Sequence, residues 1–166
     1  MTVESDQDIV VFLIGARINK WWLLPVSLPI LARMGAMLKE LRADESSGLL
    51  GVQPLGMGGT VQYWRSLEHL ERYANDRAKQ HRPAWLLFMK KLFKSSAAGI
   101  WHETFFVRAG EYESVYTNMP RFGMGRFKEL VVARGRRESF AKRLARGSAA
   151  MHGLEPPQGS GDVAGA

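Results

Sequence analysis

The order of elements expected along this chain predicts an α+β fold, β-α-β-β-α-β, the ferredoxin-like plan with an antiparallel sheet. Two observations support this prediction. Runs of β-branched and aromatic residues alternate with segments of helical apolar spacing, and Gly-rich turns separate them. A chain of 166 residues, 46% of them hydrophobic, suits a single globular domain with a tail. The absence of cysteine excludes disulfides, thiolate metal sites and cysteine nucleophiles.

The first half of the domain is expected to supply one strand, one helix and a hairpin. Residues 8–18 are apolar and rich in β-branched side chains, as in a strand with both faces buried. A helix is expected over 27–43, because apolar residues recur there every three or four positions. Its apolar stripe consists of Leu31, Met34, Leu38 and Leu41. Residues 49–54 and 60–66 are expected to pair as strands around the Gly-rich turn 55–59.

The second half is expected to supply two helices and the last strand. Ser66 is a suitable N-cap for a helix over 67–80, and Pro83 can open a further helix that ends near Ser95. The last strand is expected over 99–107. Because helices cover only one face of such a sheet, we expect a homodimer in which two sheets meet, and a pocket between sheet and helices. The strand residues that require this cover are Trp64, Trp101 and Phe105.

Basic residues are concentrated late in the chain. Of the 23 Lys and Arg residues, nine lie in 121–146, together with only two of the 16 acidic residues. We expect the ferredoxin-like domain to span 1–127, a basic and helical extension 128–146, and a disordered Pro- and Gly-rich tail 147–166. Nucleic acid is not an expected partner, because no recognised motif accompanies the charge. Contact of 128–146 with a membrane surface is an alternative that the sequence leaves open.

The first residues and the longest apolar run bear on localisation. The acidic N-terminus lacks the basic region of a signal peptide, which favours a cytoplasmic protein. Residues 21–38 are mostly apolar, but Pro25, Pro29 and Arg33 disfavour a helix that spans a membrane.

Two histidines are the candidates for chemistry. His81 follows a predicted helix, and His102 lies on the last strand beside Glu103. A histidine at a helix end, close to an apolar pocket, can ligate a haem iron. A second histidine can take up or release a proton near neutral pH. The alternation of strand residues leaves open whether His102 faces the pocket or the other side of the sheet, and both histidines can equally serve packing alone.

Three parts of the chain resemble a known family. They are residues 63–74 (YWRSLEHLERYA), His81, and residues 99–126 (GIWHETFFVRAGEYESVYTNMPRFGMGR). Together they resemble the monooxygenase-like domain family of unknown function, which is similar to the dimeric α+β barrel enzymes. The resemblance covers about residues 8–127. It implies a homodimeric enzyme of the oxidoreductase type with a small apolar or aromatic substrate.

A more distant resemblance connects the two histidines with haem. Haem-dependent aldoxime dehydratases carry a histidine after the helix and a His-Glu pair on the next strand, and the 21 residues from His81 to His102 are similar to their spacing. The resemblance implies that His81 is the axial ligand of the haem iron, His102 the distal acid/base and Glu103 its catalytic companion. Those enzymes hold two such repeats per chain, and their distal Arg and Ser have no assignable counterpart here. Candidate residues of the substrate pocket are Arg17, Tyr63, Arg65, Thr104 and Asn118.

Three functions therefore remain open. The first is a monooxygenase-like enzyme, or a lyase similar to the aldoxime dehydratases, that binds haem through His81 and moves a proton through His102. The second is a monooxygenase that oxidises an activated aromatic substrate without a cofactor. The third is a non-catalytic dimeric binding module, in which both histidines are packing residues.

Overall fold

The structure, a computed structural model, describes residues 1–4, 6–56, 58–76, 86 and 96–144. Several features expected from the sequence lie outside the described part of the chain. They are His81, the helix over 83–95, the tail 147–166, and the side chains of Leu31 and Met34.

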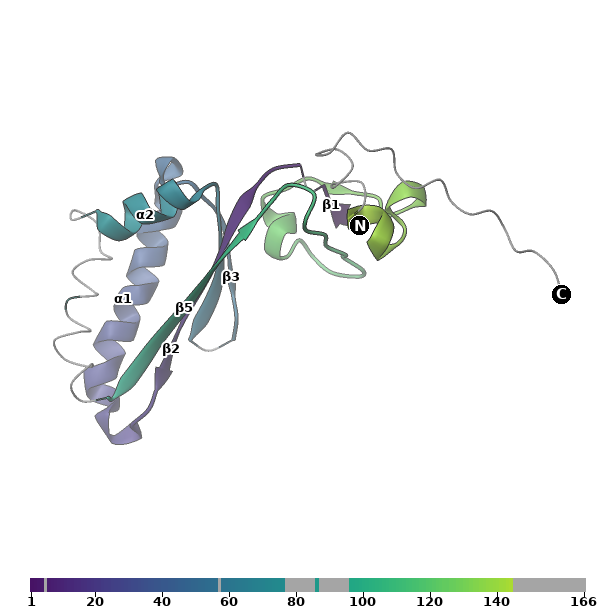
Figure 1. Cartoon of the computed structure of the whole chain (residues 1–166). Helices are drawn as coiled ribbons and strands as arrows, with labels where there is room; N and C mark the ends of the chain where they lie inside the picture. Colours follow the sequence, from purple (N-terminus) through teal and green to yellow (C-terminus); the bar gives the residue numbers. More distant parts are fainter. Residues whose placement is uncertain (5, 57, 77–85, 87–95, 145–166) are drawn as a thin grey trace.

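A four-stranded antiparallel sheet forms the centre of the domain (Figure 1). Its strand order is β3-β4-β2-β5, the order of a ferredoxin-like sheet, which confirms the predicted α+β fold. The long strand β2 lies inside the sheet, where it pairs with β5 on one side and with β4 on the other. The strands are β2 (Ile9–Ile18), β3 (Leu49–Pro54), β4 (Gly59–Trp64) and β5 (Ala98–Val107).

Both described helices lie on the same face of the sheet, as Figure 1 shows. α1 (Leu24–Ala43) begins three residues before the predicted helix, after a 3-10 turn η1 (Trp21–Leu23), and has a proline in its first turn. α2 (Leu67–Asn75) begins where predicted, because the Ser66 side chain accepts a hydrogen bond from the backbone N–H of His69. No helix in the described part of the chain is long and apolar enough to cross a membrane.

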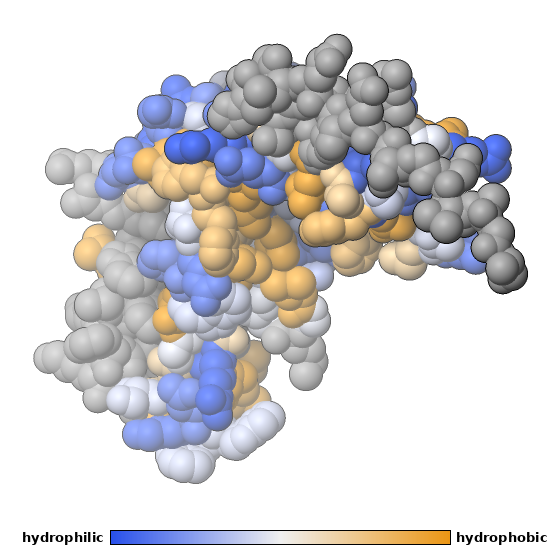
Figure 2. All heavy atoms as spheres, turned by 45° about the vertical axis from the view of Figure 1, so that its right-hand side comes forward, coloured by the Kyte–Doolittle hydropathy of each residue, from blue (hydrophilic) through white to orange (hydrophobic). Residues whose placement is uncertain are grey.

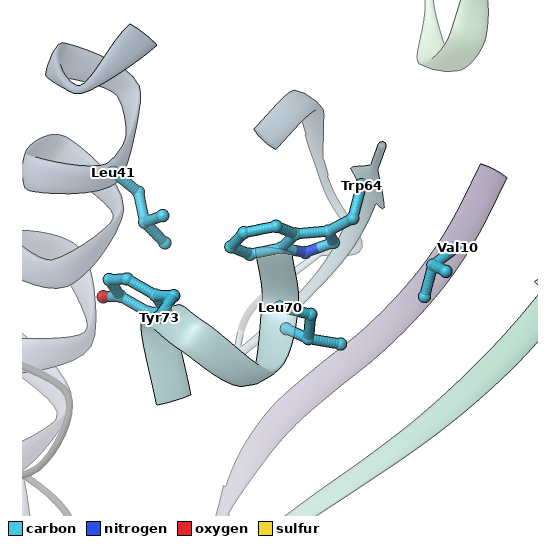
Figure 3. Packing of buried hydrophobic residues seen from close by; sticks show 5 residues of the cluster. All are labelled: Val10, Leu41, Trp64, Leu70 and Tyr73. Carbon is cyan, nitrogen blue, oxygen red and sulfur yellow. The ribbon is translucent and has the colours of Figure 1, made fainter. Parts of the chain in front are cut away.

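The main core lies between the helices and the sheet. Trp64 of β4 is fully buried there and packs at a tilt on Tyr73 of α2, with 5.9 Å between the ring centroids (Figure 3). Leu41 of α1, Leu70 of α2 and Val10 of β2 complete the cluster. The expectation that Trp64 requires a second subunit is therefore wrong. Alternate residues of β4 face the helices, and Trp64 is one of them.

The opposite face of the sheet is covered at one end. The chain after β5 folds back over this end, and Figure 1 shows it on the side away from the helices. There β6 (Leu130–Val131) pairs with β1 (Thr2–Val3), so that the two ends of the chain form a second, two-stranded sheet. Val3, Ile9 and Tyr112 are buried in this region. β1 was not expected, and β6 lies within residues 128–134, for which the sequence left a short strand or a helix open.

Two 3-10 turns shape the connections around the main sheet. η2 (Glu45–Ser47) begins at Asp44, whose carboxylate accepts a hydrogen bond from the Ser46 N–H over 3.0 Å. η4 (Gly123–Arg126) belongs to the segment after β5 and packs on β3, where Gln53 Oε1 accepts from the first N–H of the turn over 3.4 Å.

Ion pairs hold the late basic segment against acidic residues of the domain. The three pairs are Lys128–Asp6 at 2.6 Å, Arg143–Glu113 at 2.8 Å, and Arg137–Glu4. Residues of the segment 128–144 therefore contact the N-terminus and Glu113, while the division of the chain expected at 127 stays a prediction. In the described part of this segment, helical structure is limited to the 3-10 turn η5 (Gly135–Arg137) and a turn of helix over 140–144, less than the predicted helix.

The pair of Lys128 and Asp6 is partly shielded from water on the lysine side. The hydrogen bond from Lys128 lowers the pKa of Asp6. Burial acts to lower the pKa of Lys128, but hydrogen bonds with Asp6 and Tyr112 outweigh it, and the pKa is raised. Lys128 Nζ also lies 5.5 Å from the centroid of the Tyr112 ring, in a cation–π contact.

Candidate functional site

A cavity of about 450 Å³ lies between α1, α2 and the helix-facing side of the sheet. This volume falls within the range of small-molecule sites, about 300–1,000 Å³. β2 contributes Phe12, Ile14 and Ala16 from alternate positions, as a strand must. α1 contributes Leu38 and Leu41, which confirms for these two residues that the predicted stripe faces the sheet.

The described lining of this cavity contains no charged residue and few polar ones. Thr60 and Gln62 line it from β4, and Tyr73 lines it from α2. Burial raises the pKa of the Tyr73 phenol and the charge of Glu40 adds to the shift, so the hydroxyl keeps its proton at neutral pH. Gln62 accepts a hydrogen bond from the indole N–H of Trp64 over 3.1 Å. Such a lining suits a neutral and largely apolar molecule.

Glycines of the hairpin between β3 and β4 line part of the same cavity. The N–H of Ala16 donates to the carbonyl of Gly58 over 2.6 Å, which holds the turn against β2. Gly58 has a φ of +96°, and a Cβ there would lie 2.7 Å from Ala16 O. Only glycine fits this position without strain, so the Gly-rich turn has a packing role at the cavity.

His102 lies on the helix-facing side of β5. It is paired with Ile14 of β2, and its imidazole lies 5.5 Å from the Phe12 ring, centroid to centroid, with 40° between the ring planes. Both neighbours line the cavity, so His102 borders the cavity wall although it is not itself a lining residue. Its side chain is exposed.

Glu103 does not lie beside His102. Successive strand residues face opposite sides, and Glu103 is paired with Leu13 on the face away from the helices. Thr104 is paired with Phe12 and shares the helix-facing side with His102. Of the expected site residues that are described, Thr104 alone shares that side of the strand.

The remaining expected pocket residues lie elsewhere. Arg17 and Tyr63 occupy register positions on the face away from the helices, where the Tyr63 ring packs on Phe127 at 5.2 Å. Arg65 follows β4 and is exposed, and Asn118, with a φ of +52°, lies on the segment after β5. None of these four residues lines the cavity.

The described residues also contain no group of three or more metal-ligating side chains.

Sequence reasoning missed the polar residues that line the cavity. The alternation of residues 60–66 already places Thr60, Gln62 and Trp64 on one face of a strand. Choosing that face as the one beneath the helices needed the strand order, because both faces of β4 carry aromatic residues. Gln62 was therefore not recognisable as a site residue from its neighbours along the chain.

The face away from the helices has an uncovered end with apolar side chains. Trp101 and Phe105 of β5 are 44% and 46% exposed there. The Trp101 indole lies across Gly15 of β2, where a Cβ would come within 2.6 Å of Nε1. Figure 2 shows apolar atoms gathered over the middle of this side of the molecule, below the segment that follows β5.

Comparisons with known proteins give a family match and a structural likeness. The model of a family described as monooxygenase af470-like matches residues 9–124. A solved structure of a dimeric protein of unknown function and ferredoxin-like fold, from Bacteroides fragilis, is similar with 9% identity and a TM-score of 0.44. It aligns with 63% of this chain and 98% of its own. No curated protein shows significant similarity to the chain.

Proposed function

The chain belongs to the monooxygenase af470-like family, and on this basis we propose that it is a small enzyme of the monooxygenase type. Its substrate, a small apolar or aromatic molecule, binds in the cavity between α1, α2 and the sheet. The observation that carries this proposal is the lining of that cavity, which is apolar and, among the described residues, uncharged. Protein interiors are normally close-packed, so a cavity of this size favours a binding role over a purely structural one.

With an activated phenol as substrate, the reaction needs no cofactor. One atom of O2 enters the ring to give a quinone, and the other atom is reduced to water. The substrate itself supplies the two electrons and the two hydrogens that this reduction to water needs. The part of the protein is to hold the ring against Phe12 and Trp64, to exclude water and to accept the phenolic proton. His102 is the group for that proton, because it borders the cavity at Phe12.

Haem binding is the second candidate. It is favoured because His102 lies on the helix-facing side of the sheet, which is also the side of the cavity. The apolar lining suits the porphyrin ring only, so the two haem carboxylates would have to stay in solvent outside it. His81 would hold the iron, and the bound haem would supply a site for oxygen or for an N–O group. The described lining contains no histidine, so the fit at the iron depends on His81. His102 has the same role in the haem-dependent reaction as in the cofactor-free one. In both, it holds or moves a proton on the face of the sheet that lines the cavity. Glu103, on the opposite face, takes no part in this transfer.

The proposed enzyme is a homodimer that associates through the uncovered end of the sheet. Trp101 and Phe105 are exposed there, and aromatic side chains of this kind are typical of interface cores. The segment after β5 already occupies the other end of the face, so the contact runs along β5 from Phe105 to Trp101, with Glu103 on the same face between them. Two sheets that meet in this way give the dimeric α+β barrel expected from the sequence.

Oxygen uptake by one protein preparation separates the two candidates. Protein purified free of metal and haem is mixed with 1,5-dihydroxynaphthalene, and oxygen consumption is followed with an electrode, before and after addition of hemin. Uptake without hemin supports the cofactor-free reaction. A Soret band in the wild type that is absent in His81→Ala, with uptake only after hemin, supports the haem enzyme. If the wild type neither consumes oxygen nor binds hemin, both candidates fail and a binding module remains.

The role of His102 has a matched control on the same strand. We expect His102→Gln to lower the rate about 10²-fold or more, the usual loss when a general acid or base is removed. Glu103→Gln changes the next residue, on the other face, and is expected to leave the rate within about twofold. Equal rates for the two variants would exclude His102 from the proton transfer.

A further inference from the structure

We propose that Gln62 is the polar anchor of the cavity and that it selects a neutral, mainly apolar ligand that carries a hydrogen-bond acceptor. This anchor rests on the proposed function, since it concerns the ligand of the same cavity. It adds the ligand chemistry and a specificity-determining residue that the family match does not supply.

The side-chain amide of Gln62 has a defined orientation. Trp64 is fully buried, and an indole N–H can only donate. It donates to Gln62 Oε1 over 3.1 Å. The oxygen of the amide must therefore face the indole, and Nε2, on the other side of the planar group, must face away from it.

The two N–H donors on Nε2 are left to serve a ligand. Gln62 is only 6% exposed and lines the cavity. Within the described part of the chain, no acceptor takes a hydrogen bond from Nε2. A ligand that fills the cavity excludes water from Nε2, so a ligand oxygen that reaches Nε2 supplies a hydrogen bond that a purely apolar ligand does not.

The charge of the lining narrows the ligand class further. No lysine, arginine or histidine is found among the described lining residues. A carboxylate that entered would lose its hydration without gaining a counter-ion, which is strongly unfavourable. A ketone, a quinone or a phenol meets both conditions. The substrate and the product of the proposed phenol oxidation each carry such an oxygen.

A pair of isosteric probes tests the anchor by calorimetry. 2-Acetylnaphthalene presents a carbonyl acceptor, and 2-isopropenylnaphthalene has the same shape without one. In Gln62→Met, we expect the affinity ratio of acetyl to isopropenyl probe to fall about threefold to tenfold below the wild-type ratio, the usual effect of one lost hydrogen bond. Gln53→Met makes the same chemical change at a residue outside the cavity lining and is expected to keep the wild-type ratio.

Nuclear magnetic resonance supplies a measurement that does not depend on folding of the variant. In the wild type, the side-chain NH2 signal of Gln62 is expected to shift downfield with 2-acetylnaphthalene and much less with 2-isopropenylnaphthalene. The Gln53 signal is expected to respond to neither probe.

The outcomes distinguish failure of the anchor from failure of the proposed function. If both probes bind but the affinity ratio and the Gln62 signal show no preference, the anchor is wrong and the cavity remains a binding site. If neither probe binds the wild type, the cavity is not a binding site, and both proposals fall. If 2-naphthoate binds as tightly as 2-acetylnaphthalene, the assignment of a neutral ligand is wrong.

Discussion

Trp64 has two roles at the scale of single residues. Its ring fills the core between the sheet and the two helices, and its indole N–H orients the amide of Gln62. Stability and ligand recognition are therefore connected through one side chain. A change at Trp64 is expected to affect both, whereas a change at Gln62 acts mainly on recognition.

The core role of Trp64 predicts a large loss of stability on truncation. Trp64→Ala is expected to lower the free energy of unfolding by about 3–5 kcal/mol, because it removes a fully buried ring. The measurement is urea denaturation. Trp101→Ala is the matched control, since Trp101 is 44% exposed, and its cost is expected to stay below about 1 kcal/mol at concentrations where the protein is monomeric. Equal losses in the two variants would contradict the position of Trp64 in the core.

Single site residues were only partly predictable from the sequence. The strand context of His102 was recognisable, but its face was not, because β5 carries aromatic residues on both sides. Trp64 was assigned to the wrong environment for the same reason. Local alternation separates two faces without saying which one meets the helices, and that information comes from the pairing of β2 with β4 and β5.

The helix start at Ser66 is the clearest prediction at the scale of elements. Its side chain accepts from the backbone of His69 and also lies 2.8 Å from the imidazole Nδ1. We expect Ser66→Ala to lower the free energy of unfolding by about 1 kcal/mol and Ser66→Asp to retain most of it, because aspartate also caps helices. Urea denaturation of both variants is the measurement. A Ser66→Asp protein as unstable as Ser66→Ala would contradict a capping role.

The ion pair of Asp6 and Lys128, which lies beside the pairing of β1 with β6, predicts a pH dependence of stability. The folded-state pKa of Asp6 lies below its unfolded value of about 3.9, so its contribution is present above that value and is lost as the pH falls through the folded pKa. The raised pKa of Lys128 leaves its contribution intact below about pH 10 and removes it at higher pH. Asp6→Asn is therefore expected to destabilise the protein between about pH 5 and 10.

Chemical denaturation across this pH range checks the prediction. The difference between wild type and Asp6→Asn is expected to narrow steadily as the pH falls below 4. Glu71→Gln, an exposed change on α2, controls for the loss of one surface carboxylate. A difference that stays constant from pH 7 to pH 3 would show that the pair with Lys128 does not stabilise the fold.

Long elements were predictable and short ones were not. The strands and helices of the main sheet carry enough residues for periodicity and capping to mark them, as at Ile9–Ile18 and Ser66. β1 and β6 contain two residues each and pair across almost the whole chain. No local pattern fixes such strands, and residues 128–134 were compatible with a short strand or a helix. The ion pairs of the basic segment join residues far apart in the sequence, so they were not predictable from local patterns.

At the scale of the whole molecule, the two faces of the sheet are covered differently. The helix-facing side holds the core and the cavity. The other side is covered at one end by the segment after β5, and Trp101 and Phe105 are exposed on the same side. Under the proposed function, this division provides one surface for ligand binding and one for association.

Association through the uncovered end predicts a concentration-dependent dimer. Phe105→Glu places a charge on this surface without touching the core, and we expect it to raise the dimer dissociation constant at least tenfold. Sedimentation equilibrium is the measurement. Phe106→Glu changes the adjacent residue on the opposite face and is the control. A wild type that stays monomeric at high concentration, or variants that dissociate alike, would contradict this interface.

The central claim is that oxygen chemistry takes place in the cavity, and incorporation of ¹⁸O from ¹⁸O2 into 1,5-dihydroxynaphthalene, followed by mass spectrometry, tests it most directly. Gly35 of α1 lines the cavity, and a Cβ there meets no atom within 4 Å, so Gly35→Phe adds a ring without disturbing the helix. Ala36→Phe adds the same ring at the next residue, which is exposed and does not line the cavity. The account predicts one ¹⁸O atom per product for wild type and Ala36→Phe, and loss of incorporation in Gly35→Phe. Unchanged incorporation in Gly35→Phe, or none in the wild type with or without hemin, would contradict it.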